Sequence, residues 1–276
     1  MDDEIPNGVW RLDESTRVAL RLEAVRKSIA QRAFEAAMLE AEELLDESPD
    51  QPDALFLLGE ASLELGQPEV ALEAYQAAMR NGAAGFPPLI GLALAWYDLG
   101  RMTEAADRAR EAVALVPADA EAHHVLGLAL ERLDGRESEA VVHLGTAHRL
   151  DPERYPFPLK LRPVDWERAY TRALLRVHPD VAEFWQGIPV RWEDFPSLEE
   201  IATGNDPIRP TVGGLYVGAP PEHAEPWEVR PPALRLFKRN LARAPTREDL
   251  VEDLAAVLVN EALDWLGWTE SDLEDR

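Results

Sequence analysis

The chain has 276 residues, 46% of them hydrophobic and 29% charged, a composition typical of a globular protein with room for two modest cores. Its 52 Asp and Glu outnumber 28 Lys and Arg, and the formal net charge of -24 disfavours nucleic acids and membrane surfaces as partners, since we expect no local basic patch to override it. The sequence contains no cysteine, which excludes disulfides, thiolate metal sites and cysteine nucleophiles.

Residues 1–17 are predicted to form an N-terminal extension. The extension begins with acidic residues, where a signal peptide would be basic, and no apolar core follows them. The longest strongly apolar run of the chain, Leu89 to Trp96, is far too short for a helix that spans a membrane. We therefore expect a cytoplasmic protein.

A repeat of about 34 residues is predicted over residues 18–154. Its four units begin at Val18, Pro52, Phe86 and Ala120. They share three columns of small or apolar residues: Val25, Gly59, Ala93 and Gly127; Ala37, Ala71, Ala105 and Ala140; Leu44, Ala78, Ala112 and Ala147. Small residues at such positions let the two antiparallel helices of each unit approach closely.

The turn between the two helices of a unit carries a second signal. Gly66, Gly100 and Gly135 stand at this turn in units two to four, whereas the first unit has Arg32 there. The spacing and these residues resemble the tetratricopeptide repeat. The resemblance implies a helical solenoid of four repeats, the first of them degenerate.

Tetratricopeptide repeats usually bind peptides or proteins on the concave face formed by the first helix of each unit. By register, the candidate groove residues here are Leu22, Arg26, Phe56, Glu60, Ile90, Leu94, Tyr97, His124 and Leu128. Family members that grip a terminal carboxylate use Lys and Asn in these columns, so that kind of ligand is not expected. The acidic chain favours a partner with a basic or amphipathic segment. Alternatively, Phe56, Ile90 and Tyr97 pack against the protein's own C-terminal domain.

The helical period stops near Leu150, and residues 155–163 are predicted to be a Pro-rich linker. The remainder, residues 164–276, is predicted to be a small α+β domain. Helical spacing covers 164–177, strand patterns cover 188–192, 214–217 and 233–238, and one short helix is expected near Leu198.

The last predicted helix lies between Thr246 and Gly267. Thr246 with Asp249 indicates a helix start of capping-box type, and Gly267 indicates the end of the helix. On a helical projection Glu261 and Asp264 fall on the face that we expect to be buried. Desolvation and mutual repulsion are then expected to raise the apparent pKa of the pair, with the Asn260 amide available as a donor.

This C-terminal region resembles the minimal zincin-like metallopeptidases, in which a strand and an Arg-Asn-Leu turn precede a helix bearing HExxHxxGxxD. In that family the two His and the final acidic residue would hold zinc, and the Glu would be the general base. Here the aligned residues are Asn260 and Asp264 for the two His, Glu261 for the base and Glu270 for the third ligand. An Asn amide is a poor zinc ligand, so the resemblance implies a relic motif without catalysis, and we expect no metal and no cofactor.

We therefore predict a mainly α protein, a four-repeat tetratricopeptide solenoid followed by a zincin-like α+β domain, acting as a protein-binding adaptor or regulator. Alternatives remain. An all-oxygen ligand set centred on Glu261 would suit a hard cation and a metal-dependent peptidase, and His178 or His223 could rebuild a zinc site. The C-terminal domain could also serve only to cap the solenoid. His123, His124, His143 and His148 lie in the fourth repeat and are interpreted as structural or groove-lining.

Overall fold

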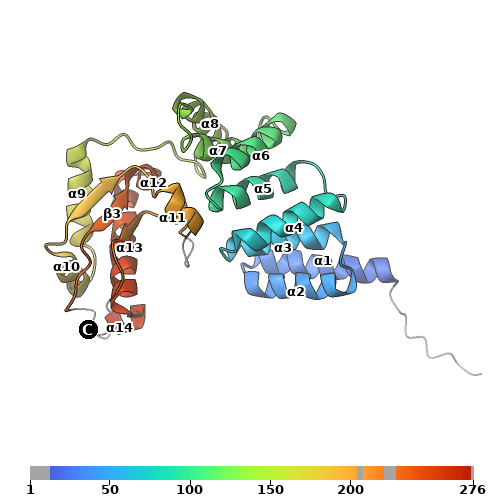
Figure 1. The fold of residues 1–276 in the computed structure, drawn as a ribbon, viewed down its shortest axis with the longest axis horizontal. Coiled ribbons are helices and arrows are strands. Elements are labelled where there is room, and N and C mark those ends of the chain that lie inside the picture. The colour runs from blue at the N-terminus through green and yellow to red at the C-terminus, as the bar shows by residue number, and fades with distance from the viewer. Residues whose placement is uncertain (1–12, 204–207, 221–227, 275–276) are drawn as a thin grey trace, which may run out of the picture. The chain divides into compact units, whose positions relative to one another are not determined.

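The computed structural model describes residues 13–203, 208–220 and 228–274, and it confirms a mainly α fold (Figure 1). The chain divides into two compact units, Met1–Pro117 and Ala118–Arg276. This division falls between the third and fourth predicted repeats rather than in the predicted linker. Among the described residues, no helix has the length and apolar character needed to cross a bilayer.

The first unit is a stack of antiparallel helices. They are α1 (Glu14–Ala30), α2 (Phe34–Glu47), α3 (Pro52–Glu64), α4 (Pro68–Arg80), α5 (Phe86–Asp98) and α6 (Met102–Leu115). The helices α3 and α5 begin at the residues predicted to begin a repeat. Helix α1 begins earlier than Val18, because the Asp13 side chain caps it by accepting a hydrogen bond from the Thr16 backbone nitrogen at 2.9 Å.

The predicted small-residue columns form the helix contacts of this unit. Ala37, Ala71 and Ala105 are fully buried. A Cβ atom placed on Gly59 would lie 2.7 Å from the Tyr75 ring, closer than real contacts allow. The column therefore holds glycine here because an aromatic side chain of the neighbouring helix fills the space.

Arg32 takes over the role of a turn glycine in the first repeat. Its φ of 59° lies in the left-handed region, as do the φ values of 72° at Gly66 and Gly100. For an L-residue with a Cβ atom, this conformation costs roughly 1 kcal/mol. The first repeat thus keeps the turn geometry of the others with a less suitable residue.

The second unit begins with the helix pair of the fourth repeat and continues into a small sheet with surrounding helices. Its helices are α7 (Ala120–Leu130), α8 (Glu137–Leu150), α9 (Pro163–Leu174), α10 (Pro179–Trp185), α11 (Leu198–Thr203), α12 (Lys238–Leu241), α13 (Arg247–Leu266) and α14 (Glu270–Glu274). Its strands are β1 (Val190–Glu193), β2 (Gly214–Tyr216) and β3 (Leu234–Phe237). The three predicted strands and the helix near Leu198 are confirmed with shifted ends, whereas α10 was not predicted.

The sheet has the order β1-β3-β2, with β1 parallel and β2 antiparallel to β3. Helix α13 packs against α9, α10 and β2, and the core between them contains Trp185, Leu236, Leu254 and Trp265. The Trp185 indole nitrogen donates a hydrogen bond of 2.8 Å to the Leu258 carbonyl. Strand β2 is left at one edge of the sheet, beside the C-terminal half of α13.

The predicted linker is held at its start and at its middle within this unit. Tyr155 is buried, and its ring lies 4.4 Å from the His124 ring of α7. The Tyr155 carbonyl oxygen lies 3.0 Å from Nδ1 of His148 in α8. Further on, the Leu159 backbone nitrogen donates a hydrogen bond of 2.6 Å to the Ala242 carbonyl. The segment is therefore an ordered connection that packs on the elements it joins.

Candidate functional site

The helix predicted to carry the relic motif forms as expected. The Thr246 side chain caps α13 by accepting hydrogen bonds of 3.2 Å from the Glu248 and Asp249 nitrogens. Gly267 ends the helix in the left-handed conformation, with a φ of 65°. Local capping signals thus place Glu261 and Asp264 in the last turns of α13, opposite the edge strand β2.

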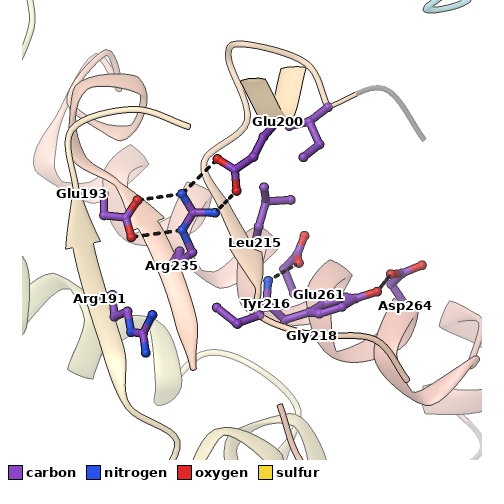
Figure 2. Close-up of a pocket in the computed structure, with 11 residues that line it drawn as sticks. Arg191, Glu193, Glu200, Leu215, Tyr216, Gly218, Arg235, Glu261 and Asp264 are labelled. Atoms are coloured by element: carbon purple, nitrogen blue, oxygen red, sulfur yellow. Dashed lines mark hydrogen bonds and ion pairs between the residues drawn. The ribbon is translucent and has the colours of Figure 1, made fainter. Parts of the chain in front are cut away.

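Tyr216 of β2 binds both carboxylates of this helix end (Figure 2). Its backbone nitrogen donates a hydrogen bond of 2.9 Å to Oε2 of Glu261, and its hydroxyl donates one of 2.6 Å to Oδ2 of Asp264. The Tyr216 ring also packs edge-on against Trp265, with 5.1 Å between ring centroids. Sequence reasoning did not identify Tyr216, although the strand that bears it was predicted.

The two carboxylates differ in burial, and this corrects the expectation that both lie on the buried face. Glu261 is partly buried, whereas Asp264 is exposed, because Leu258, Ala262 and Trp265 mark the buried stripe at this end of the helix. Burial raises the pKa of the Glu261 carboxyl to about 7. The hydrogen bond from the Tyr216 backbone acts in the opposite direction, and the negative charge of Asp264 adds a smaller rise. The predicted rise in pKa is therefore found at Glu261, mainly through desolvation.

The residues present do not fit a zinc ion. Asn260 and Glu270 are exposed, and the Asp264 carboxylate is engaged by the Tyr216 hydroxyl. Over the described ranges, no three His, Asp or Glu side chains lie together as a group that could hold a metal ion. His178 accepts a hydrogen bond of 3.3 Å from the Asp180 nitrogen at the start of α10, and His223 lies outside the described residues.

A polar cavity of about 810 Å³ opens beside Glu261 and Asp264. Arg235 of β3 crosses it and pairs with two carboxylates: it donates hydrogen bonds of 3.0 and 2.7 Å to Glu193 and also bonds to Glu200 (Figure 2). The hydrogen bonds from Arg235, together with those from Ser197, lower the pKa of Glu200 to about 2. Arg191 of β1 also lines the cavity, and it has no acidic partner among the residues that the structure describes.

Asn240, in the middle of the Arg-Asn-Leu turn, holds one wall of this region. Its side-chain nitrogen donates hydrogen bonds of 2.8 Å to the Pro210 carbonyl and 2.7 Å to the Val212 carbonyl. Its side-chain oxygen accepts one of 2.8 Å from Arg243. Asn240 is buried, so these bonds fix the segment that leads directly into β2 and Tyr216.

The candidate groove residues of the repeats differ widely in accessibility. In the first unit, Leu22, Ile90 and Tyr97 are buried, Phe56, Glu60 and Leu94 are partly buried, and Arg26 is exposed. Phe56 rests against Tyr75, with 5.6 Å between ring centroids, within an apolar cluster of the helices. Several of these side chains therefore contribute to the packing of the repeats.

The two candidate groove residues of the second unit pack against the chain itself. Leu128 is buried, and the His124 ring packs at a tilt against Tyr155 of the linker. Burial, with added repulsion from Arg243 and Arg154, lowers the pKa of His124 to about 4, which keeps its ring neutral. His123 and His143 approach each other through their Nδ1 atoms at 2.8 Å.

Comparison with protein families finds two matches. The family described as tetratricopeptide repeat matches residues 21–85 and 90–154, and the family described as zincin-like metallopeptidase matches residues 185–276. Both regions agree with the resemblances seen in the sequence. A comparison with curated proteins gives no match.

Among solved structures, the chain is similar to repeat proteins. One is YrrB, described as a TPR protein with an unusual peptide-binding site: identity is 18%, 48% of this chain and 68% of that chain are covered, and the TM-score is 0.43. A MamA fragment from Desulfovibrio magneticus RS-1 is 22% identical, with 49% and 76% covered and a TM-score of 0.44. Another MamA structure is 19% identical, with 53% and 79% covered and a TM-score of 0.43.

Proposed function

Since the chain joins tetratricopeptide repeats to a zincin-like metallopeptidase domain, we propose that it is a protein-binding adaptor or regulator whose peptidase-like domain does not hydrolyse peptides. One observation carries this proposal. Glu261, at the position of the general base, is hydrogen-bonded to the Tyr216 backbone, and Asn260 and Asp264 replace the imidazoles that would hold zinc. The cytoplasmic location that the sequence suggests is part of the same proposal.

The chemistry of these side chains supports a loss of catalysis. A metallopeptidase base must accept a proton from water that a metal has activated. Oε2 of Glu261 accepts the Tyr216 N–H, and the Asp264 carboxylate accepts the Tyr216 hydroxyl. Both carboxylates are therefore used to attach α13 to the sheet edge.

The experiment compares the wild-type chain with the double substitution Asn260→His/Asp264→His, which restores the two imidazoles. Both proteins are incubated with zinc, desalted and analysed for bound metal, and both are assayed on casein. We expect no stoichiometric zinc and no turnover for the wild type, and about one zinc per chain for the double variant. Zinc in the wild type, with chelator-sensitive turnover that Glu261→Gln removes, would overturn the proposal.

The binding part of the proposal rests on the first unit. Residues 1–117 contain 22 acidic and 10 basic residues, so this unit attracts a basic or amphipathic segment. In this unit, the exposed or partly buried candidate groove residues are Arg26, Phe56, Glu60 and Leu94, and of these Phe56 packs in an apolar cluster of the helices. Arg26, Glu60 and Leu94 remain for contact with a partner. We propose that a partner polypeptide contacts these positions.

This part is tested with synthetic peptides and the full chain. Fluorescence anisotropy compares a labelled amphipathic Lys/Leu peptide with a matched Glu/Leu peptide, on wild type and on Glu60→Arg/Leu94→Arg. We expect the basic peptide to bind more tightly, binding to weaken as salt increases, and the double variant to lose affinity by about tenfold or more. Equal binding by wild type and variant would exclude this surface.

A further inference from the structure

The fold creates a basic surface that the sequence analysis did not expect. Residues 154–176 contain six basic and two acidic residues, and residues 235–247 contain five basic and no acidic residues, in a chain of net charge -24. The two segments meet in the second unit, where the Leu159 nitrogen donates a hydrogen bond to the Ala242 carbonyl and Arg247 pairs with Asp165 of α9. Because they are distant in sequence, only the tertiary structure concentrates their charges.

Two adjoining hollows lie on this surface, which we call the basic face. The larger, of about 480 Å³, is bordered by Lys160, Arg162, Lys238 and Arg239, with Asp194 as its one acidic residue. The smaller, of about 150 Å³, is bordered by Arg168, Arg172 and Arg247, with Asp165 as its one acidic residue. Leu161 lines both hollows, so they form one continuous face.

Seven basic side chains line the two hollows, and three acidic residues pair with them: Asp165, Asp194 and Glu248, which lies 2.6 Å from Arg172. Asp165 is buried and shared between Arg162 at 3.1 Å and Arg247 at 3.5 Å. Asp194 is shared in the same way between a lysine and an arginine of α12. Lys160 and Arg168 are exposed and have no acidic partner within the described part of the chain. A net positive potential therefore remains at the rims of both hollows.

The floors of the hollows are apolar, which narrows the choice of ligand. Leu159, Leu161 and Trp166 line the larger hollow, and Leu250 and Val251 line the smaller. Trp166 is only 7% exposed and cannot offer its ring face to a nucleotide base. An apolar floor with a cationic rim instead complements a segment that carries bulky apolar side chains between carboxylates.

We propose that the basic face binds an acidic amphipathic segment of a partner protein, with its apolar side chains in the two hollows and its Asp and Glu residues near Lys160 and Arg168. The repeats of the first unit favour a basic partner, so the chain has two surfaces that select partners of opposite charge. This inference goes beyond the proposed function and does not depend on the state of the zincin-like site.

The test uses the full chain and three labelled probes: an acidic amphipathic peptide of Glu and Leu, the same peptide with every Leu replaced by Ser, and a short DNA duplex. Fluorescence anisotropy is measured at low and high salt. We expect the Glu/Leu peptide to bind, the Glu/Ser peptide to bind at least about fivefold more weakly, and salt to weaken both. A duplex that binds more tightly than the Glu/Leu peptide would overturn the assignment in favour of nucleic acid.

Charge-reversal variants test whether the Glu/Leu peptide binds on the basic face. Lys160→Glu/Arg168→Glu reverses two exposed charges and is expected to weaken binding of the Glu/Leu peptide by about tenfold or more. Arg17→Glu/Arg80→Glu, which makes the same change in net charge at exposed positions of the first unit, is the matched control and should change affinity by less than about twofold. Lys160→Ala/Arg168→Ala should give an intermediate loss. The assignment would be refuted if the control lost as much affinity as Lys160→Glu/Arg168→Glu, or if Lys160→Glu/Arg168→Glu lost no affinity.

Discussion

Glu261 and Tyr216 are joined by a hydrogen bond of 2.9 Å from the backbone nitrogen of the edge strand to the carboxylate on α13. The bond satisfies an edge N–H that points away from β3, and it places an ionisable group in a partly buried position. In a functioning metallopeptidase the corresponding carboxylate would need to face a metal-bound water. Here the same side chain stabilises the contact between the helix and the sheet.

The burial of Glu261 makes stability depend on pH. Its pKa of about 7 in the folded state lies above the ordinary value of 4.5, so the folded protein holds this proton more tightly than the unfolded chain. The stabilising contribution is complete below about pH 4.5 and is lost as the pH rises through about 7. Glu261→Gln keeps an acceptor for the Tyr216 N–H without a charge. It should raise the free energy of unfolding by roughly 1 to 3 kcal/mol at about pH 8, with little change at about pH 4.

Urea denaturation of the wild type and Glu261→Gln across this pH range measures the effect. Glu270→Gln is the matched control, because Glu270 is an exposed carboxylate of the same motif. It should leave the pH profile unchanged. If the free energy of unfolding of Glu261→Gln changes with pH in the same way as that of the wild type, Glu261 does not have a raised pKa in the folded protein.

Asn240 should be important for the stability of the second unit. It is buried, and its amide donates to two carbonyl groups of the segment before β2. Asn240→Ala leaves the Pro210 and Val212 carbonyls without this donor and is expected to cost about 2 to 4 kcal/mol. Hydrogen exchange should become faster in residues 211–217, because this segment loses its anchor.

The control for this experiment is Asn260→Ala, since the Asn260 side chain is exposed on α13. Its effect on the free energy of unfolding should stay within about 0.5 kcal/mol. If both variants were equally stable, the Asn240 hydrogen bonds would not hold the segment. The comparison also tests whether the residue at the first relic position contributes anything to the fold.

Arg32 and Gly66 allow a reciprocal test of the repeat turn. Both residues have left-handed φ values at equivalent positions, 59° and 72°. Arg32→Gly removes the strain of a Cβ at this position and should stabilise the first unit by about 0.5 to 1 kcal/mol, and Gly66→Ala should destabilise it by about 1 kcal/mol. Thermal unfolding followed by circular dichroism measures both changes. The same sign for the two variants would contradict this account of the turn.

The repeats were predictable because their signal is local and recurs along the chain. Helices α3, α5 and α7 begin at Pro52, Phe86 and Ala120, where the register places the start of a unit. The turn geometry follows from one position per unit, even where Arg32 replaces glycine. Each repeat contains its own capping and packing information, so no distant contact is needed to recognise it.

The candidate site was only partly predictable. Thr246 and Gly267 fix both ends of α13, so the position of Glu261 on the helix follows from local sequence. Its hydrogen-bond donor is Tyr216, 45 residues away, and no spacing rule connects the two. The basic face was missed for the same reason, because its charges come from two segments that meet only in the folded chain. Long-range pairing is the information that a single sequence lacks.

The fourth repeat is attached to the zincin-like domain within the second unit. Arg132 at the end of α7 donates a hydrogen bond of 2.7 Å to the Pro196 carbonyl, and its guanidinium lies 4.4 Å from the Phe195 ring centroid. Glu131 beside it pairs with Arg243. Arg132 also donates a hydrogen bond of 3.5 Å to the Pro210 carbonyl, so its side chain contacts the loop between β1 and α11 and the segment before β2, both of which adjoin the polar cavity. The fourth repeat therefore packs on the domain.

Arg132→Ala should therefore destabilise the second unit by about 1 to 3 kcal/mol and speed hydrogen exchange in the loop that contains Phe195 and Pro196. Arg136→Ala is the matched control, because Arg136 pairs with the nearby Glu139 of α8, and its effect should stay within about 0.5 kcal/mol. If hydrogen exchange in this loop is as slow in Arg132→Ala as in the wild type, the Arg132 contacts do not hold the loop. Faster exchange confined to the loop, with α8 unchanged, would show that the repeat pair folds independently of the domain it covers.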